Sequence, residues 1–328
     1  MEHVSRKHDL LFHYTTCSGL KGILESQSLH ATHYKYLNDA SELHAIAPKL
    51  RELAGPAIRE LLMEMANSNE GLIEINSQGG FESCVVNDVE RVVDGIYAVT
   101  LGNLGRHKFY QPYIASFCNH NEPYERSNGL LSQWRGYGAA SGYAIVFNAE
   151  KLEELLLREA ASHAYDYGFL GDVVYAGDEE AFMAEFPNLG SVVRDSIRAV
   201  SDDQAVFSSF YSEFVLSASR FKHQGFKEEQ EVRLCVSPRD PMMTEKLRER
   251  GPNYAGAHEY KNIKTILFKD NFVPYVNIFG DLEGRSLPIA KVIVGPHADK
   301  QGRRDRLCRY LEIRGIEIEV FCSETPFV

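Results

Sequence analysis

The chain has 328 residues, of which 44% are hydrophobic and 25% are charged, the balance of a globular protein with a sizeable core. Acidic residues outnumber basic ones by 46 to 35, which gives a net charge of −11 and makes the chain as a whole a poor non-specific ligand for nucleic acid or an anionic membrane. No apolar run approaches the roughly 20 residues of a membrane span, and the first ten residues lack the apolar core of a signal peptide. We therefore expect a cytoplasmic protein with no membrane partner.

Several familiar cofactor and catalytic motifs are missing from the sequence. The six cysteines stand far apart without a C-x-x-C pair, which excludes a zinc ribbon or a dithiol redox motif. His30 with His33, and Cys118 with His120, have no further partners at ligand spacing, so we predict no metal site. The glycines at 136–142 precede a strand instead of joining a strand to a helix, which argues against a Rossmann fingerprint. Neither a P-loop nor a G-x-S-x-G elbow occurs.

The first third of the chain is predicted to be one short strand followed mostly by helices. Residues 10–14 form an apolar strand, and Thr16 or Ser18 can cap the helix that follows it. Pro48 is expected to kink or break the helix in which it lies. The other elements predicted here are an extended segment at 29–36, helices at 41–53 and 57–66, and a loop rich in Asn, Ser and Gly at 67–80.

The rest of the chain is predicted to alternate strands with helices around one β core. We predict an α+β fold in which residues 1–328 form a single domain, with helical insertions near 41–66 and 179–222. The predicted strands are 113–118, 142–147, 173–175, 231–236, 264–268, 291–295 and 316–321. The predicted helices are 130–135, 151–163, 179–223 and 300–313, with a polar loop at 119–128.

Three segments gather polar and aromatic side chains at the ends of predicted strands. The first is Leu11-Phe12-His13-Tyr14-Thr15-Thr16, and the second is Leu131-Ser132-Gln133-Trp134-Arg135-Gly136-Tyr137-Gly138, which holds the only tryptophan. The third, from Phe221 to Leu234, puts Glu229, Glu231 and Arg233 on one face if its strand begins early. Taken singly, each has an ordinary interpretation: a satisfied histidine, core aromatic rings and a solvated run of charges.

Together and in this order, the three segments resemble the ADP-ribosyltransferase superfamily. The first is similar to the opening motif of the poly-ADP-ribose polymerases, a strand ending in His-x-Thr/Ser before a Leu-x-x-Ile-Leu helix. RNA 2′-phosphotransferases and DNA-modifying toxins look similar there. The order of segments also resembles an uncharacterised bacterial family with H-Y-T, S-Q-W-R-G-Y-G and F-x-x-E-x-E-x-R blocks. The resemblance implies an ADP-ribosyltransferase-like fold, with a split, strongly twisted β core and peripheral helices.

The resemblance also implies NAD as a co-substrate held by the first two segments. His13 would bond the adenosine-side ribose, and the backbone of Tyr14 would pair with the nicotinamide carboxamide, supported by Thr15. The polymerases usually have Gly where this chain has Tyr14. In the second segment Tyr137, five residues after Ser132, would stack on the nicotinamide ring, with Trp134 as the alternative stacking side chain.

The third segment would supply the acid. The resemblance implies that Glu231 bonds the ribose of the nicotinamide half and stabilises the oxocarbenium-like state as nicotinamide leaves. Glu228 and Glu229 compete with Glu231 for this place, and we prefer Glu231 because it enters the apolar strand directly. Arg135 or Arg233 would hold the pyrophosphate, which suits a bidentate guanidinium.

We expect an NAD-consuming ADP-ribosyltransferase, an enzyme of the glycosyltransferase class, that modifies a cellular macromolecule. A bacterial toxin or phage-defence effector fits this expectation, with an inhibitor or antitoxin as a candidate partner. The net charge favours a protein acceptor, while a basic helix with Arg303, Arg304, Arg306 and Arg309 keeps a nucleic-acid acceptor open. The alternatives are an NAD glycohydrolase, an RNA 2′-phosphotransferase-like enzyme, and a non-catalytic module that senses NAD or ADP-ribose.

Overall fold

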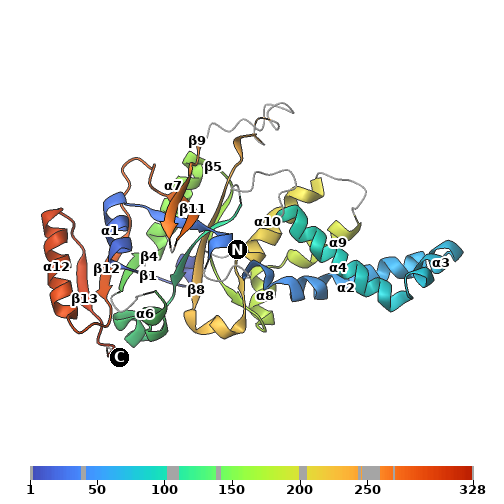
Figure 1. Cartoon of the computed structure of the whole chain (residues 1–328), viewed down its shortest axis with the longest axis horizontal. Coiled ribbons are helices and arrows are strands. Elements are labelled where there is room, and N and C mark those ends of the chain that lie inside the picture. The colour runs from blue at the N-terminus through green and yellow to red at the C-terminus, as the bar shows by residue number, and fades with distance from the viewer. Residues whose placement is uncertain are drawn as a thin grey trace. The chain divides into compact units, whose positions relative to one another are not determined.

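The computed structural model describes residues 3–37, 42–101, 111–137, 142–198, 205–242, 245, 259–268 and 270–326, and it mixes helices with a mixed, twisted sheet (Figure 1). The chain divides into two compact units. Unit 1 comprises Met1–Leu37, Pro112–Val173 and Gly225–Val328, and unit 2 comprises Asn38–Gln111 and Val174–Gln224. Both segments predicted as helical insertions fall in unit 2. The prediction of a single domain with insertions stays a prediction.

Unit 1 contains the large sheet and the three segments singled out in the sequence. Its strands are β1 (Leu10–Thr15), β2 (Leu29–His33), β3 (Tyr113–Cys118), β4 (Tyr143–Asn148), β5 (His163–Asp172), β8 (Glu231–Pro238), β9 (Glu259–Tyr260), β10 (Ile263–Phe268), β11 (Asn271–Ile278), β12 (Ile289–Val294) and β13 (Glu319–Cys322). Its α-helices are α1 (Cys17–Ser26), α5 (Pro123–Asn128), α6 (Leu131–Tyr137), α7 (Ala149–Ser162) and α12 (Lys300–Ile313), with 3-10 turns at Val4–Arg6, Tyr34–Tyr36 and Gln224–Glu229.

The sheet of unit 1 branches at β3. One edge of β3 pairs with β8 along its whole length, and β8 continues to β5. The other edge is shared, because β2 pairs with Tyr113 and Ile114 while β1 pairs with Cys118. From β1 the sheet continues through β4 and β12 to β13, and from β2 it continues through β11 to β10. Within the described residues, the single pair between Phe12 of β1 and Cys118 of β3 therefore joins the branch β1-β4-β12-β13 to the rest of the sheet.

Alternation of side chains along the strands gives the sheet two different faces. The larger core lies on the face of Leu11 and Phe117, where α1, α7 and α12 contribute buried leucines. The smaller cluster lies on the opposite face, where Phe12, Tyr14 and Trp134 pack together and α6 contributes the tryptophan. The predicted site residues are thus divided between two faces of one sheet.

The segment from β1 to α1 is built as the sequence predicts. Thr16 caps α1 by accepting a hydrogen bond from the Gly19 N–H, with 3.2 Å between the two atoms. The helix ends at Gln27, whose φ of 48° is left-handed. A Cβ atom at Gly19 would lie 2.1 Å from Oγ1 of Thr15, so glycine is needed for α1 to turn back this closely on β1.

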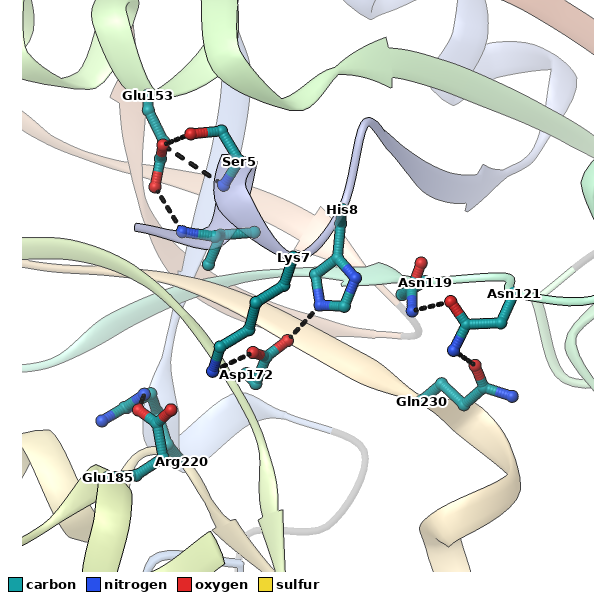
Figure 2. A network of polar contacts seen from close by, with 11 residues as sticks. Ser5, Lys7, His8, Asn119, Asn121, Glu153, Asp172, Glu185, Arg220 and Gln230 are labelled. Carbon is teal, nitrogen blue, oxygen red and sulfur yellow. Dashed lines mark hydrogen bonds and ion pairs between the residues drawn. The ribbon is translucent and has the colours of Figure 1, made fainter. Parts of the chain in front are cut away.

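Two carboxylates fix the N-terminal segment in front of β1 (Figure 2). Glu153 of α7 accepts hydrogen bonds from the backbone N–H groups of Val4 and Ser5 and from the Ser5 hydroxyl. Asp172, the last residue of β5, lies 2.7 Å from Nε2 of His8 and 3.2 Å from Nζ of Lys7. Burial raises the pKa of Asp172, but the contacts with His8 and Lys7 outweigh burial and leave the pKa below its usual value.

Within its described residues, unit 2 is mainly helical, with one short pair of parallel strands and several ion pairs. Buried Arg220 donates to Glu185 over 3.0 Å, and Nζ of Lys49 lies 2.6 Å from Glu179 (Figure 2 shows the first of these pairs). Its elements are α2 (Ala47–Met65), α3 (Asn69–Ser77), α4 (Phe81–Thr100), β6 (Val174–Tyr175), α8 (Glu179–Glu185), α9 (Leu189–Arg198), α10 (Ala205–Ala218) and β7 (Phe221–Lys222), with a 3-10 turn at Glu42–His44.

Three of the local predictions are wrong. Pro48 does not break a helix, because it lies in the first turn of α2, where its missing N–H has no partner to lose. The predicted loop at 67–80 contains α3, which Ser68 caps through a 3.0 Å hydrogen bond from the Gly71 N–H. The second half of the predicted loop at 119–128 is α5, and Pro123 begins this helix instead of excluding one.

The sequence patterns also miss α4, β5 and β11. Gly168 and Gly171 lower the strand propensity of β5, and Pro274 does the same for β11. The predicted helical stretch 179–223 separates into α8, α9 and α10, and it ends in β7. The prediction of a helix at 300–313 is confirmed by α12.

Candidate functional site

The candidate site is the point where β1 and β3 stop pairing. Phe12 lies opposite Cys118, and two residues further along β1 the same register would place Tyr14 opposite Ser116. No pair forms there, because the strands diverge and β2 takes the next part of β3 at Ile114. We call the facing backbone of Tyr14 and Ser116 the open edge.

The backbone polar groups of Tyr14 point toward the open edge. The Ala149 N–H donates to the Asp9 C=O over 3.0 Å, so in the antiparallel β1–β4 pair the odd-numbered residues of β1 bond to β4. The even-numbered residues direct their N–H and C=O groups to the other side. Phe12 meets Cys118 on that side, whereas Tyr14 meets no strand among the described residues. One donor and one acceptor of the same residue are therefore left at the open edge.

His13 reaches across the open edge. Its Nδ1 lies 2.9 Å from the backbone carbonyl oxygen of Ser116, and since a carbonyl only accepts, the hydrogen is on Nδ1. Nε2 has no hydrogen-bond partner in the described part of the chain, and the ring is half-buried. Burial lowers the pKa of His13, and the bond to Ser116 opposes this only in part. His13 therefore presents a neutral ring whose Nε2 can accept a hydrogen bond.

The side chain of Tyr14 belongs to a buried hydrogen-bond chain. Its hydroxyl oxygen accepts from the Leu130 N–H over 2.8 Å and lies 2.6 Å from Nε2 of His120. The hydroxyl and the His120 ring share one hydrogen bond, whose direction depends on which ring nitrogen carries the hydrogen. Nδ1 of His120 lies 3.8 Å from Oε2 of Glu125. Burial lowers the pKa of His120 to about 4 and raises the pKa of Tyr14.

Trp134 is a core residue in this structure. Its Nε1 donates to the carbonyl oxygen of Asn128 over 3.0 Å, and its ring meets the ring of Tyr14 edge-on at 4.7 Å. A Cβ atom placed on Gly129 or Gly295 would lie 2.6 or 2.8 Å from the tryptophan ring. The ring is thus closely surrounded and only 5% of the residue is exposed, which fits packing better than the predicted stacking on NAD.

The remaining predicted residues of α6 lie on its exposed side. The Ser132 hydroxyl donates to Glu228 over 3.1 Å, which ties α6 to the turn before β8. Arg135 is exposed, with no ion-pair partner within the described ranges. Tyr137 ends the helix with 40% of its surface exposed, so its ring is accessible to a ligand. Gly138 lies outside the described residues.

Glu231 and Arg233 form a buried ion pair at the start of β8. Nε of Arg233 lies 2.8 Å from Oε1 of Glu231, and its second terminal nitrogen lies 3.0 Å from Oε2. This bidentate geometry uses one edge of the guanidinium, as a phosphate would, and Arg233 is only 1% exposed. Arg233 is therefore better explained as a positioning residue for Glu231, and Arg135 is the more accessible of the two arginines.

β8 begins at Glu231, as the strand predicted over 231–236 does, and the earlier start that would put Glu229 on the same face is not found. Glu229 ends a 3-10 turn, and Gln230 has a φ of 44°, so Glu229 is not in strand register with Glu231. The turn is held from the other side by a chain of amides, in which Asn119 donates to Asn121 over 3.1 Å and Asn121 donates to Gln230 over 3.5 Å (Figure 2). These contacts fix where β8, and with it Glu231, begins.

The faces of the sheet separate the predicted residues. Phe12 pairs with Cys118 and Cys118 pairs with Glu231, so the side chain of Glu231 lies on the face of Phe12 and Tyr14, two strand spacings or about 10 Å from β1. His13 and Thr15 lie on the opposite face. Glu231 and the backbone of Tyr14 are brought to one region, whereas the side chains of His13 and Glu231 do not face each other.

Sequence reasoning missed three residues of this site. The carbonyl of Ser116, the ring of His120 and the carboxylate of Glu125 all come from β3 or the segment after it. His120 attracts attention only as a neighbour of Cys118, in a motif too short for a metal site. The informative signal is the run of polar residues directly after a buried strand, which often marks a functional edge of a sheet.

Two further observations concern metals and membranes. Among the described residues, no three His, Cys, Asp or Glu side chains converge as metal ligands. Within the same residues, every helix is too short or too polar to cross a lipid bilayer.

Comparison with known protein families gives a match to part of the chain. A family model described as a protein of unknown function (DUF2971) matches residues 133–234, about a third of the chain. The matched stretch begins in α6 and ends in β8, so it includes Trp134, Tyr137, Glu231 and Arg233 but not β1. No curated protein and no solved structure matches this chain.

Proposed function

We propose that the protein is an NAD-consuming ADP-ribosyltransferase whose nicotinamide pocket is the open edge of β1. The observation that carries this proposal is the unpaired backbone of Tyr14. A carboxamide offers one N–H donor and one C=O acceptor, and it can pair with the C=O and N–H of a single strand residue as a further strand would. The nicotinamide carboxamide fits this requirement.

The charges around the open edge support the same proposal. Cleavage of the bond between nicotinamide and ribose develops positive charge on the ribose, and a fixed carboxylate stabilises it. Glu231 lies on the same face as Tyr14, and Arg233 holds both of its oxygens in place. Nicotinamide leaves with the electron pair of the broken bond, and the ADP-ribosyl group bonds to a nucleophile of the acceptor, which loses a proton.

The ring contact and the anion contact would come from α6. Tyr137 is exposed at the end of the helix and can cover the nicotinamide ring, while Arg135 is the accessible cation for the pyrophosphate. His13, through Nε2, would accept a hydrogen bond from a ribose hydroxyl at the other face of the edge. The acceptor is a cellular macromolecule, and the chain's net charge of −11 favours a protein.

The test is nicotinamide release from NAD by purified protein, with and without cell lysate. Glu231→Gln should still bind NAD in calorimetry but release nicotinamide at least about 100-fold more slowly. Glu317→Gln, an exposed change of the same type in unit 1, serves as the matched control. If Glu231→Gln fails to fold, the double variant Glu231→Gln/Arg233→Met removes both charges and restores a neutral interior. Equal rates in wild type and a folded Glu231 variant would overturn the assignment of the acid.

A second candidate is a module that senses NAD or ADP-ribose without cleaving it. The buried bidentate pair of Glu231 and Arg233 favours it, because a carboxylate already neutralised by arginine stabilises developing positive charge less well. A sensor would bind NAD and release no nicotinamide, with or without lysate. An NAD glycohydrolase would release nicotinamide at the same rate in both conditions and leave the lysate unlabelled.

A further inference from the structure

Unit 1 contains a cavity of about 550 Å³ that includes none of the residues assigned to NAD. It is lined by α1, by the first residue of β4 and by α12 with the loop before it. Its volume lies within the range of small-molecule sites, which is roughly 300–1,000 Å³. The side chains of the lining determine which class of molecule the cavity can bind.

The polar part of the lining is strongly basic. Lys21 of α1 and Arg303 and Arg306 of α12 contribute three permanent cations, and no carboxylate stands among the described residues that line the cavity. This is unusual in a chain with a net charge of −11. Lys21 has no ion-pair or hydrogen-bond partner in the described part of the chain. The cavity therefore attracts an anion.

Two arginines are held in place around the cavity. The guanidinium of Arg303 lies 5.0 Å from the ring centre of Tyr143, a cation–π contact. Arg306 lies 2.7 Å from Asp299, outside the lining, and this contact raises the pKa of Arg306, with a smaller contribution from Tyr143. Arginines fixed in this way suit phosphate, which they bind through two parallel N–H groups.

Tyr143 adds an accessible hydroxyl to the lining of the cavity. The residue is only 4% exposed, yet its hydroxyl has no hydrogen-bond partner among the described residues. Its hydroxyl oxygen is not fully buried, and the residue lines the cavity. The hydroxyl is therefore available to donate or accept a hydrogen bond with a molecule bound in the cavity.

The rest of the lining is apolar. Leu20, Leu24 and Leu307 are buried side chains that face the cavity, and Tyr310 adds an aromatic ring. A bare inorganic phosphate would use the basic part and leave this apolar wall in water. A ligand that carries an apolar ring beside its anionic group would bind more tightly than a bare anion. The reason is that burial of apolar surface adds binding free energy at about 25 cal/mol per Å².

We propose that this cavity binds a nucleoside monophosphate, with its phosphate on Lys21, Arg303 and Arg306 and its base against the leucines and Tyr310. The Tyr143 hydroxyl would bond the sugar or the phosphate. This proposal does not rest on the NAD proposal, because it uses other residues. The proposed site lies between α1, the start of β4 and α12.

Cys17 provides a direct readout of occupancy. It is exposed and lines the cavity, so a bound ligand should slow its alkylation by iodoacetamide, measured by peptide mass spectrometry. The probes are the four common nucleoside monophosphates, tested one at a time, together with adenosine and inorganic phosphate. We expect at least one monophosphate to protect Cys17 at a concentration at which adenosine and phosphate do not.

Variants of the basic residues test where the phosphate of the ligand binds. Arg303→Gln and Lys21→Gln should each raise the concentration needed for protection about tenfold or more, since each removes a charge-assisted contact. Arg309→Gln is the matched control, because Arg309 lies on the same helix, is exposed and does not line the cavity. His13→Asn should leave protection unchanged, which separates this cavity from the proposed NAD site.

Three results would overturn the proposal. In the first, none of the monophosphates protects Cys17. In the second, phosphate alone protects it as well as a monophosphate, which would make the cavity a simple anion site. In the third, Arg309→Gln weakens protection as much as Arg303→Gln, which would assign the effect to the overall charge of α12.

Discussion

Nε2 of His120 lies 2.6 Å from the hydroxyl of Tyr14 in the interior of unit 1, and 106 residues of sequence separate them. The same hydroxyl accepts a hydrogen bond from the N–H of Leu130, the residue just before α6. One phenol thus connects β1, the end of β3 and the start of α6. Since two hydrogen bonds hold the end of the side chain, the backbone of Tyr14 at the open edge is held in position too.

Tyr14→Phe should destabilise the protein without changing its shape. The variant leaves the Leu130 N–H and a ring nitrogen of His120 without partners in the interior, at a cost of about 1–3 kcal/mol each in an unfavourable case. We expect a loss of at least about 1 kcal/mol in the free energy of unfolding, measured by urea denaturation. Tyr124→Phe, at an exposed tyrosine of α5, should be neutral. A stable Tyr14→Phe would mean that water replaces the hydroxyl.

The stability of unit 1 should fall as the pH drops from about 6.5 to about 4. Burial lowers the pKa of His120 to about 4, while the histidine of an unfolded chain titrates near 6.5. Between these values the unfolded chain binds a proton that the folded protein does not, so acid favours unfolding. This contribution of His120 is fully present above pH 6.5, and it amounts to about 3 kcal/mol at most.

His120→Gln isolates this contribution. Glutamine can hydrogen-bond the Tyr14 hydroxyl as donor or acceptor but does not titrate. Because burial also lowers the pKa of His13, the wild type and the variant should both lose some stability in acid. The free energy of unfolding should fall further between pH 7.5 and pH 4.5 in the wild type than in His120→Gln, and this difference is the contribution of His120. Parallel curves would show that His120 titrates normally.

His13→Asn tests the histidine in NAD binding. Asparagine can still donate an N–H toward the Ser116 carbonyl but lacks an acceptor in the place of Nε2. We expect a small change in melting temperature and a loss of NAD affinity of roughly 5-fold to 100-fold, the cost of one polar contact in a site. Calorimetry with NAD measures the affinity. Normal NAD binding would restrict His13 to holding β1 and β3 together.

Tyr137 separates a stacking role from a hydroxyl role. If its ring covers nicotinamide, Tyr137→Phe should keep most of the nicotinamide release and Tyr137→Ala should lose most of it. Tyr124→Ala, which removes another exposed tyrosine, should leave the rate unchanged. Full activity in Tyr137→Ala would remove Tyr137 from the site.

The elements best predicted from the sequence are those decided locally. The apolar run of β1, the capping by Thr16 and the helix at 300–313 all follow from neighbouring residues. Pro48 misled the prediction, because whether a proline begins or breaks a helix depends on where the helix starts. β11 carries Pro274 and becomes a strand only through its partners β10 and β2.

The site was predictable in its residue types but not in its arrangement. The patterns select Tyr14 and Glu231, yet the open edge depends on where β1 and β3 diverge, which no local pattern records. The bond between His13 and Ser116 spans 103 residues. The pairing of Glu231 with Arg233 needs only the alternation of one strand, and it could have been inferred once β8 begins at Glu231.

The direction of the Tyr14 backbone has a consequence for hydrogen exchange. Amides in the middle of a buried strand usually exchange slowly, because a neighbouring strand holds each hydrogen. In β1 the amides of residues 13 and 15 are held by β4, while that of residue 14 points to the open edge. Deuterium should therefore enter β1 at one central amide well before its two neighbours, and a ligand paired with that amide would close this point of entry.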